Sequence, residues 1–427
     1  MKRLKILVFP CGSEIGLEIH RSLKYSSHVE LFGANSIDDH GRFVYDNYIV
    51  GVPFIDNDDV IPYLTNLVSE LKIDAIYPTM DKVIWKLKAN EDSLGCKVLA
   101  SECETTEICL SKRKTYEIFK EIIKVPKFYN AIEKIESYPV FVKPDIGYGS
   151  RGVFKAENES ELSCFFESKE FSDYIVTEYL PGEEYTVDCF TDRMGNLRFI
   201  GPRKRGRISN GISVFTKPVT DNQCDFESIA FKINQTKKFN GAWFFQVKRA
   251  SDNSLVLLEI ASRLGGSSSL YRGIGVNFAL LTIFDAFGFD IDILVNNIGI
   301  EMDRALDNKY KLYFEYSKVY VDFDDCLIMN NKVNQKLVGF LYSCVNQGKR
   351  IILITKHENN LKESLKTYRL NNLFDEIIHL DKSDKKYKYI NGTDCLFIDD
   401  SFTERKEVKE KLNILVFSPD MIETLVN

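Results

Sequence analysis

Strand and helix patterns alternate at both ends of the chain, and this alternation limits the folds open to it. In the first hundred residues, apolar runs at 5–9, 29–34 and 74–78 read as buried strands, and the segment 60–71 has a helical pattern. Gly12 and Gly16 mark the turn from the first strand into a helix. We take that turn as structural, because glycine turns of this kind are common. Strands that alternate with helices form parallel sheets, so we expect an open α/β domain here.

A second series of the same kind closes the chain. Strands are expected at 319–321, 350–354, 376–380 and 395–398, again with helices between them. The last hundred or so residues are therefore predicted to form another parallel α/β sheet.

The middle of the chain is built differently. A basic helical stretch at 105–124 is followed by glycine-broken strands, expected at 140–142, 174–177, 185–190, 197–201, 242–247 and 255–260. The turn at Gly195 and Asn196 suits a hairpin, and the last two strands read as an antiparallel pair around the polar turn 251–254. A chain of 427 residues is too long for one core. We predict three domains, 1–102, 103–308 and 309–427, of mixed α/β and α+β class.

Composition narrows the class of ligand. Apolar residues make up 44% of the chain and charged residues 28%, as in ordinary globular proteins, and the formal charge of -6 gives no general attraction to nucleic acid or anionic membrane. We expect small-molecule ligands, no nucleic acid and no membrane. The ten cysteines form no CxxC pair or metal-spaced cluster, which indicates reduced thiols. The apolar run before Pro10 is too short for a signal peptide, so a cytoplasmic location is expected.

A lysine and a glycine-rich loop follow one another in the middle domain. Lys143 stands at a strand end, and the loop after it holds Gly147, Gly149 and Ser150. Glycines let backbone N–H groups approach phosphate oxygens, and the lysine adds a cation. Alone this is a weak motif, since glycine-rich turns after strands are common. Further along, Gln246 and Glu259 are expected on adjacent strands, where their oxygens could hold Mg²⁺.

The order of these parts resembles the ATP-grasp superfamily over residues 103–300, in particular the carbamoyl phosphate synthetase large subunit, biotin carboxylase and amino-acid ligases. The resemblance implies a two-lobed ATP-grasp domain preceded by a pre-ATP-grasp α/β domain, with ATP and Mg²⁺ as cofactors and Mn²⁺ as an alternative ion. By motif, Lys112 and Lys143 would contact the nucleotide phosphates, with Lys114 a rival for the first role. The other implied positions are Glu178 and Leu180 beside adenine, Glu184 at the ribose, Gln246 and Glu259 as metal ligands, and Arg263 at the acyl phosphate.

The implied reaction phosphorylates a carboxylate and joins it to an amine or similar nucleophile. Ala261 departs from the family pattern, because many relatives have an asparagine there as a further metal ligand. We interpret this as a modified metal site. Two alternatives stay open: a non-catalytic ATP- or metabolite-binding protein, and an enzyme that phosphorylates bicarbonate as carbamoyl phosphate synthetase does.

The densest basic run, residues 201–207, carries three arginines at alternating positions, Arg203, Arg205 and Arg207. On an extended segment they would point the same way and could grip a substrate carboxylate or phosphate. A solvated basic hairpin is an equal alternative.

Acidic and hydroxyl side chains follow three strands of the last domain. Asp322 and Asp324 follow the first, Thr355 ends the second, and Asp399 and Asp400 follow a later one. Ligands bind at this edge of a parallel sheet, although a single acid pair after a strand is more often a helix cap.

This set resembles the haloacid dehalogenase superfamily over residues 317–427. The resemblance implies that Asp322 is the nucleophile, carrying an aspartyl phosphate, and that Asp324 is the general acid/base. Thr355 would bind the phosphoryl group, and one lysine of the segment 382–386 would neutralise it, for which we choose Lys386 over Lys382 and Lys385. Asp322, Asp399 and Asp400 would hold Mg²⁺. The motif spacing leaves no room for a large cap, so the domain would be capless and Rossmann-like, with an open site for a phosphorylated metabolite or a bulkier substrate. A homodimer is one option for the assembly.

Overall fold

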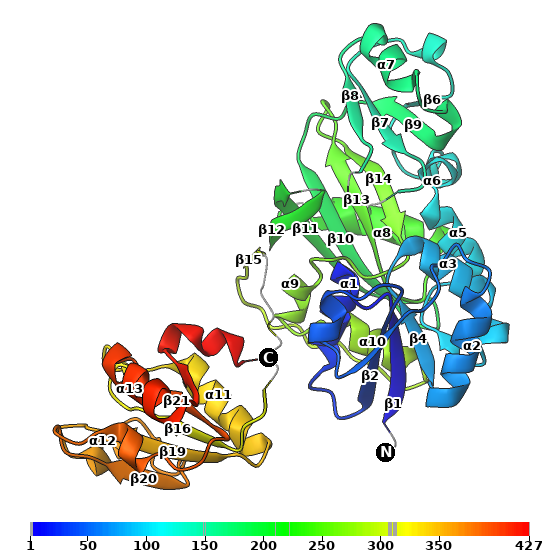
Figure 1. The fold of residues 1–427 in the computed structure, drawn as a ribbon. Helices are drawn as coiled ribbons and strands as arrows, with labels where there is room; N and C mark the ends of the chain where they lie inside the picture. Colours follow the sequence, from blue (N-terminus) through cyan, green and yellow to red (C-terminus); the bar gives the residue numbers. More distant parts are fainter. Residues whose placement is uncertain are drawn as a thin grey trace. The chain divides into compact units, whose positions relative to one another are not determined.

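The chain folds into two compact units, Met1–Leu306 and Asp307–Asn427 (Figure 1). The computed structural model describes residues 3–147, 149, 151–209, 211–221, 223–305, 310 and 314–426. The division falls beside the boundary expected at 308 and 309, while the two domains expected before it lie in one unit. Within the described ranges, no helix is long and apolar enough to cross a membrane.

The first unit opens with a five-stranded parallel sheet in the order β3-β2-β1-β4-β5. Its strands are β1 (Leu4–Phe9), β2 (Val29–Asn35), β3 (Asn47–Val50), β4 (Ala75–Pro78) and β5 (Lys97–Val98), and its helices are α1 (Glu14–Leu23), α2 (Val60–Leu71), α3 (Asp81–Ala89) and α4 (Glu91–Leu94). The predicted parallel α/β arrangement is confirmed. The turn before α1 is structural, as expected: Ser13 caps the helix, and a Cβ on Gly16 would lie 2.3 Å from the backbone oxygen of Cys11.

The basic helical stretch predicted at 105–124 is two helices. α5 (Cys103–Leu110) ends before Ser111, and α6 (Lys112–Phe119) begins after it. Ser111 is extended and its side chain accepts a hydrogen bond from the backbone N–H of Lys114, so it caps the second helix. The helical character expected for this stretch is thus divided between two helices by a serine cap, and the second helix ends at Phe119.

A small four-stranded sheet follows, in the order β6-β9-β7-β8. It contains β6 (Phe128–Tyr129), β7 (Val140–Pro144), β8 (Phe154–Ala156) and β9 (Tyr174–Glu178), with α7 (Glu159–Phe166). Tyr129, Val140, Val142, Leu162 and Val176 form its core.

A six-stranded sheet forms the larger lobe, in the order β14-β13-β10-β11-β12-β15. Its strands are β10 (Glu184–Thr191), β11 (Leu197–Ser209), β12 (Ile212–Pro218), β13 (Gly241–Arg249), β14 (Leu255–Ala261) and β15 (Met302–Asp303), and its helices are α8 (Gln223–Thr236), α9 (Ser269–Arg272) and α10 (Phe278–Ala286). Both predicted antiparallel pairs, β10 with β11 and β13 with β14, are confirmed. Residues of β1, α1, α9 and α10 share one hydrophobic core, which joins this lobe to the first sheet.

The second unit is a five-stranded parallel sheet in the order β20-β19-β16-β21-β22. Its strands are β16 (Lys318–Val321), β19 (Arg350–Thr355), β20 (Glu376–His379), β21 (Cys395–Ile398) and β22 (Leu415–Phe417), and its helices are α11 (Gln335–Asn346), α12 (Leu361–Thr367) and α13 (Phe402–Leu412). A short hairpin, β17 (Ile328–Met329) with β18 (Lys332–Val333), follows the first strand. The central strand β16 lies between β19 and β21, so the ends of these three strands are neighbours.

Candidate functional site

One cavity of about 180 Å³ gathers the residues predicted to bind nucleotide. Its lining combines the small sheet, the six-stranded sheet and the start of α6. Of the ten positions predicted for phosphate, adenine, ribose and metal, nine line it: Lys112, Lys143, Gly147, Gly149, Glu178, Leu180, Glu184, Gln246 and Glu259. Ser150 lies outside the described residues. Side chains separated by up to 147 positions in the sequence are thus brought together in one place.

Strand register explains how the polar residues of the large sheet meet. Gln246 on β13 pairs with Thr186 on β10 and with Glu259 on β14. Glu184 lies two positions before Thr186, and alternate residues of a strand share a face. The side chains of Glu184, Gln246 and Glu259 therefore project from the same face of the sheet, into the cavity. Two oxygen-bearing side chains on paired strands fit a hard divalent ion. Ala261, two residues beyond Glu259, adds no ligand.

Lys143 is buried at the end of β7. Its Nζ donates to the hydroxyl oxygen of Tyr116, 2.6 Å away, and to the backbone oxygen of Leu258, 3.2 Å away. Tyr116, on α6, donates in turn to the same Leu258 oxygen at 2.7 Å. Burial, together with the charge of Lys112, lowers the pKa of Lys143 from 10.5 to about 7, although Glu259 and Glu184 oppose the shift. Sequence reasoning gave Tyr116 no role, yet its position one helical turn after Lys112 puts both on one side of α6.

The two candidate lysines of α6 point to different places. Lys112 lines the cavity, and its Nζ donates to the backbone oxygens of Asp145 and Gly147 at 3.2 and 3.3 Å. Lys114 is 51% exposed and pairs with Glu107. The placement favours Lys112 over its rival. Asp145 also accepts hydrogen bonds from the Ser111 hydroxyl and the Arg113 backbone N–H, at 2.8 and 2.7 Å, so the start of the glycine loop is fixed to α6.

The three arginines of the basic run have three different environments. Arg203 is buried and pairs with Asp188 at 2.6 Å. Arg205 enters the cavity, where it donates to Glu184 and to Gln246. Arg207 is 61% exposed and pairs with Asp303. The strand register shifts between Arg205 and Arg207, so the expected common direction of all three was wrong.

Arg263 is not among the residues that line this cavity. Its Nε and Nη2 donate to the two carboxylate oxygens of Asp81, at 2.9 and 3.0 Å, and its guanidinium lies 5.3 Å from the centre of the Phe244 ring. Asp81 is the first residue of α3, at the edge of the N-terminal sheet. Arg263 therefore holds the loop after β14 against that sheet. Its predicted contact with an acyl phosphate stays a prediction.

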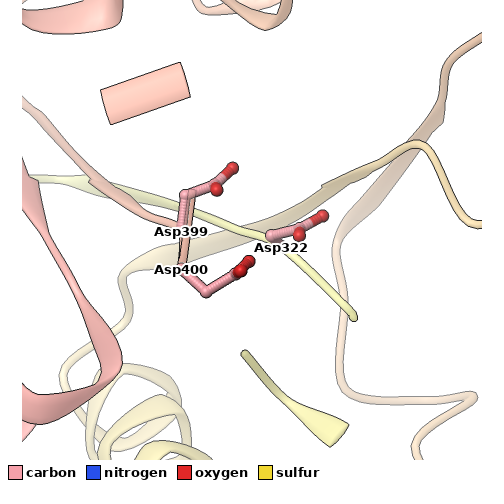
Figure 2. A group of neighbouring side chains, drawn as sticks. All are labelled: Asp322, Asp399 and Asp400. Atoms are coloured by element: carbon pink, nitrogen blue, oxygen red, sulfur yellow. The ribbon is translucent and has the colours of Figure 1, made fainter. Parts of the chain in front are cut away.

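In the second unit, three carboxylates gather at the ends of β16 and β21. Oxygen atoms of Asp322, Asp399 and Asp400 all lie within 4.8 Å of one another, and Figure 2 shows the three carboxylates grouped. Lys386 Nζ lies 2.9 Å from Asp322 and 2.7 Å from Asp399. The Asp322 Oδ1 atom is buried, and the Lys386 ammonium is the cation 2.9 Å from it. Three carboxylates grouped this closely, two of them buried, fit a magnesium ligand set.

Charge and burial oppose one another around these acids. Burial raises the pKa of Asp322, although Lys386 acts in the opposite direction. Burial also raises the pKa of Asp399 to about 6, with the charge of Asp322 adding to the shift and Lys386 opposing it. For Lys386, burial alone would lower the pKa, but the two aspartates outweigh it and the pKa is raised. The buried lysine is thus held as a cation between two acids.

The remaining predicted residues lie at the same sheet edge. Thr355 is fully buried at the end of β19, and its side chain hydrogen-bonds Asp322. The Asp324 side chain is 52% exposed, and it contacts His357, a buried residue that sequence reasoning missed. The signal available was a histidine two positions after Thr355, at the predicted functional edge of the sheet.

Comparison with known proteins supports the ATP-grasp superfamily. Residues 170–299 match a family described as ATP-grasp in the biosynthetic pathway with Ter operon. The D-alanine–D-alanine ligase of Thermotoga petrophila is 30% identical over 143 residues, 32% of this chain and 47% of the ligase. The arginine-specific large chain of carbamoyl phosphate synthase from Halalkalibacterium halodurans is 37% identical over 82 residues, 18% of this chain and 7% of that protein. The chain thus spans less than half the length of these relatives.

A solved structure shows the same fold. The biotin carboxylase domain dimer of Hydrogenobacter thermophilus 2-oxoglutarate carboxylase, solved with MgADP, ADP and bicarbonate, superimposes with a TM-score of 0.58 at 18% identity, covering 68% of this chain and 71% of that one. This likeness shows that 68% of the chain shares the fold of that domain, while the haloacid dehalogenase resemblance stays a prediction.

Proposed function

We propose that the first unit is an ATP-grasp ligase that uses Mg-ATP to phosphorylate a carboxylate and then joins it to an amine or similar nucleophile. One observation carries this: nine residues predicted from the motif line a single cavity. Lys112 and Lys143 would hold the phosphates, Glu178 and Leu180 would lie beside adenine, and Glu184 would accept from the ribose. Gln246 and Glu259 would hold the magnesium, which neutralises charge on the phosphates when bound. Arg263 is the proposed contact for the acyl phosphate.

The two lysines of α6 give a matched test of this proposal. Lys112→Met removes a cation from the cavity, and Lys114→Met removes an exposed cation two residues away. Loss of one charged hydrogen bond lowers affinity by about 10- to 100-fold. We expect that loss of Mg-ATP affinity for Lys112→Met and an unchanged affinity for Lys114→Met, measured by calorimetry. Equal effects of the two substitutions, or no nucleotide binding by the unaltered chain, would remove the assignment.

The reaction itself is tested by ADP release. Candidate carboxylates and amines are supplied with Mg-ATP, and only a ligase releases ADP in proportion to amide product. If the chain binds ATP but releases no ADP with any pair of carboxylate and amine, it is a non-catalytic binding protein. That alternative is open because Ala261 stands where many relatives have a metal-binding asparagine. ADP release that requires bicarbonate would indicate chemistry of the carbamoyl phosphate synthetase kind.

For the second unit we propose a magnesium-dependent phosphatase-type site. The supporting observation is the group formed by Asp322, Asp399 and Asp400, whose oxygens lie within 4.8 Å of one another, with the Lys386 Nζ atom 2.9 Å from Asp322. Asp322 would attack the phosphorus atom and carry the phosphoryl group as an aspartyl phosphate. Thr355 and Lys386 would orient the phosphoryl oxygens, Asp324 would exchange the proton, and magnesium would screen the negative charges. The substrate class is a phosphorylated metabolite or a phosphorylated side chain reached through an open site.

Substitutions at two nearby acids, Asp322 and Asp325, test this site. Asp322→Asn removes the nucleophile and is expected to lower phosphate release from p-nitrophenyl phosphate by at least about 100-fold. Asp325→Asn changes an exposed acid three positions away and is expected to leave the rate unchanged. A rate that does not depend on Asp322 would exclude the proposed nucleophile.

A further inference from the structure

Asp324, His357 and Ser364 form a hydrogen-bonded relay beside the proposed phosphatase site. The Nδ1 atom of His357 lies 2.9 and 3.0 Å from the two carboxylate oxygens of Asp324, and its Nε2 atom lies 3.0 Å from the Ser364 hydroxyl oxygen. The histidine follows β19, and the serine is on α12. The imidazole ring therefore links the segment after β16 to α12, on the side of the paired strands β16 and β19.

The partners of the ring define its hydrogen positions. When Asp324 is ionised its oxygens only accept hydrogen bonds, so in that state Nδ1 carries the hydrogen and donates to Asp324. In the neutral ring Nε2 is then an acceptor, and the Ser364 hydroxyl donates to it. The edge of the ring contacts Phe323, with ring centres 4.8 Å apart, and the His357 side chain is only 8% exposed. The imidazole is thus fixed on several sides.

His357 also contacts the phosphoryl-binding side of the site through its backbone. Its N–H donates to the Thr355 hydroxyl oxygen at 3.2 Å, and its carbonyl oxygen lies 2.7 Å from His379 Nε2. The Thr355 oxygen accepts this bond, so its own O–H is directed elsewhere, and the Thr355 side chain hydrogen-bonds Asp322. One residue therefore contacts both Asp324 and Thr355, the two groups on either side of the nucleophile.

The exposure of the three side chains indicates which of them faces the substrate. The same three residue types form the serine hydrolase triad, in which the serine is the reacting end and the acid is buried. Here the acid is the open end, because the Asp324 side chain is 52% exposed while Asp322, two residues before it, is the proposed nucleophile. Ser364 lies within α12, and its hydroxyl hydrogen-bonds the His357 ring. The relay therefore holds the Asp324 carboxyl group in position at the proposed phosphatase site.

We propose that His357 is a positioning residue that holds Asp324 in place for proton transfer, with Ser364 fixing the ring. This inference rests on the proposed phosphatase function. In the first step an Asp322 oxygen attacks phosphorus, the bond from phosphorus to the leaving oxygen breaks, and that oxygen takes a proton from the Asp324 carboxyl. In the second step water attacks phosphorus and gives its proton to Asp324. The bond between phosphorus and the Asp322 oxygen breaks, so phosphate is released and Asp322 is restored. His357 holds one side of the carboxyl group and does not carry the transferred proton.

Leaving groups of different quality test this role. Phenyl phosphate needs protonation of its leaving oxygen far more than p-nitrophenyl phosphate does. His357→Leu is expected to lower kcat for phenyl phosphate at least about tenfold more than kcat for p-nitrophenyl phosphate, with KM little changed. His357→Asn keeps an N–H near the Nδ1 position and should restore most of the loss. Ser364→Ala, a change at a half-buried position, should shift the ratio in the same direction but less.

A double substitution separates positioning from a general structural effect. In an Asp324→Asn chain the further change His357→Leu should lower kcat no more, since the group it holds is already inactive. Additive losses, or an unchanged ratio between the two substrates in His357→Leu, would overturn the inference while Asp322-dependent hydrolysis stands. Labelling of Ser364 by a fluorophosphonate probe would also overturn it, because the serine would then be a nucleophile. If the unaltered chain hydrolyses neither ester, the proposed phosphatase function fails first.

Discussion

At the scale of single residues, Lys143 is the group whose chemistry depends most on its surroundings. Its pKa of about 7 means that the amine of the free protein is largely neutral at pH 8 to 9. The cause is burial and the neighbouring Lys112 cation. A bound phosphate would add negative charge and favour the ammonium form. We therefore expect nucleotide binding to be coupled to the protonation of this residue.

The sign of the resulting pH dependence is defined. Above pH 7 the free protein must take up a proton to bind, so nucleotide affinity should fall as the pH rises from 7 to 9. Calorimetry at pH 8.5 in buffers of different ionisation enthalpy should show uptake of close to one proton per nucleotide. Lys143→Met should abolish that uptake. The same uptake in the substituted chain would assign the effect to another group.

Tyr116 supports Lys143 and is predicted to matter for stability. Tyr116→Phe removes the hydroxyl that accepts from Lys143 and donates to the Leu258 oxygen. Loss of a buried hydrogen-bond partner costs about 1–3 kcal/mol. Urea denaturation should show the free energy of unfolding lowered by this amount. Tyr63→Phe, at a partly exposed position on α2, is the matched control and should leave the free energy nearly unchanged.

At the scale of elements, the regular segments were predictable and the irregular ones were not. The apolar runs at 5–9, 29–34 and 350–354 correspond closely to β1, β2 and β19, because buried parallel strands are nearly continuous in apolar residues. The register shift in β11 and the break at Ser111 depend on single residues inside longer patterns. These local features decide that Arg205 enters the cavity and Arg207 does not. Strand pairing in the folded chain determines these side-chain directions, which the sequence pattern does not show.

Prediction of the site residues from the sequence has the same limit. Asp322 and Asp399 were found because a parallel sheet places strand ends together, and Lys143 was found from the glycine-rich loop that follows it. Tyr116 and His357 were missed because each acts through a partner far away in sequence, Leu258 or Asp324. Contacts of that kind become visible only once the chain is folded.

The link between α6 and the glycine loop is an element-scale feature with its own prediction. Asp145→Ala removes the acceptor of the Ser111 hydroxyl and the Arg113 N–H. The loop should then detach more readily from the start of α6, because loops are anchored by such bonds. We expect faster limited proteolysis of the 145–152 segment and slower proteolysis again when Mg-ATP is added. Asp145→Asn, which keeps an acceptor oxygen, should cleave more slowly than Asp145→Ala, and equal rates would contradict the role of these bonds.

At the scale of the whole molecule, each hydrophobic core belongs to one unit. Four clusters of buried residues lie within the first unit and two within the second, among the described residues. A unit with its own core unfolds as its own cooperative step. We therefore expect the two units to unfold in separate steps.

Two thermal transitions are expected for the full chain, and ligands should separate them. Mg-ATP binds the proposed cavity of the first unit, so it should raise only one transition, by a free energy of about 2.7 kcal/mol at 100 times the dissociation constant. Differential scanning calorimetry measures both transitions in one scan. Lys143→Met should remove the shift caused by Mg-ATP, whereas Asp322→Asn should leave it intact because Asp322 lies in the second unit. A single transition that moves as a whole with Mg-ATP would mean that the two cores unfold together and that the units are not energetically independent.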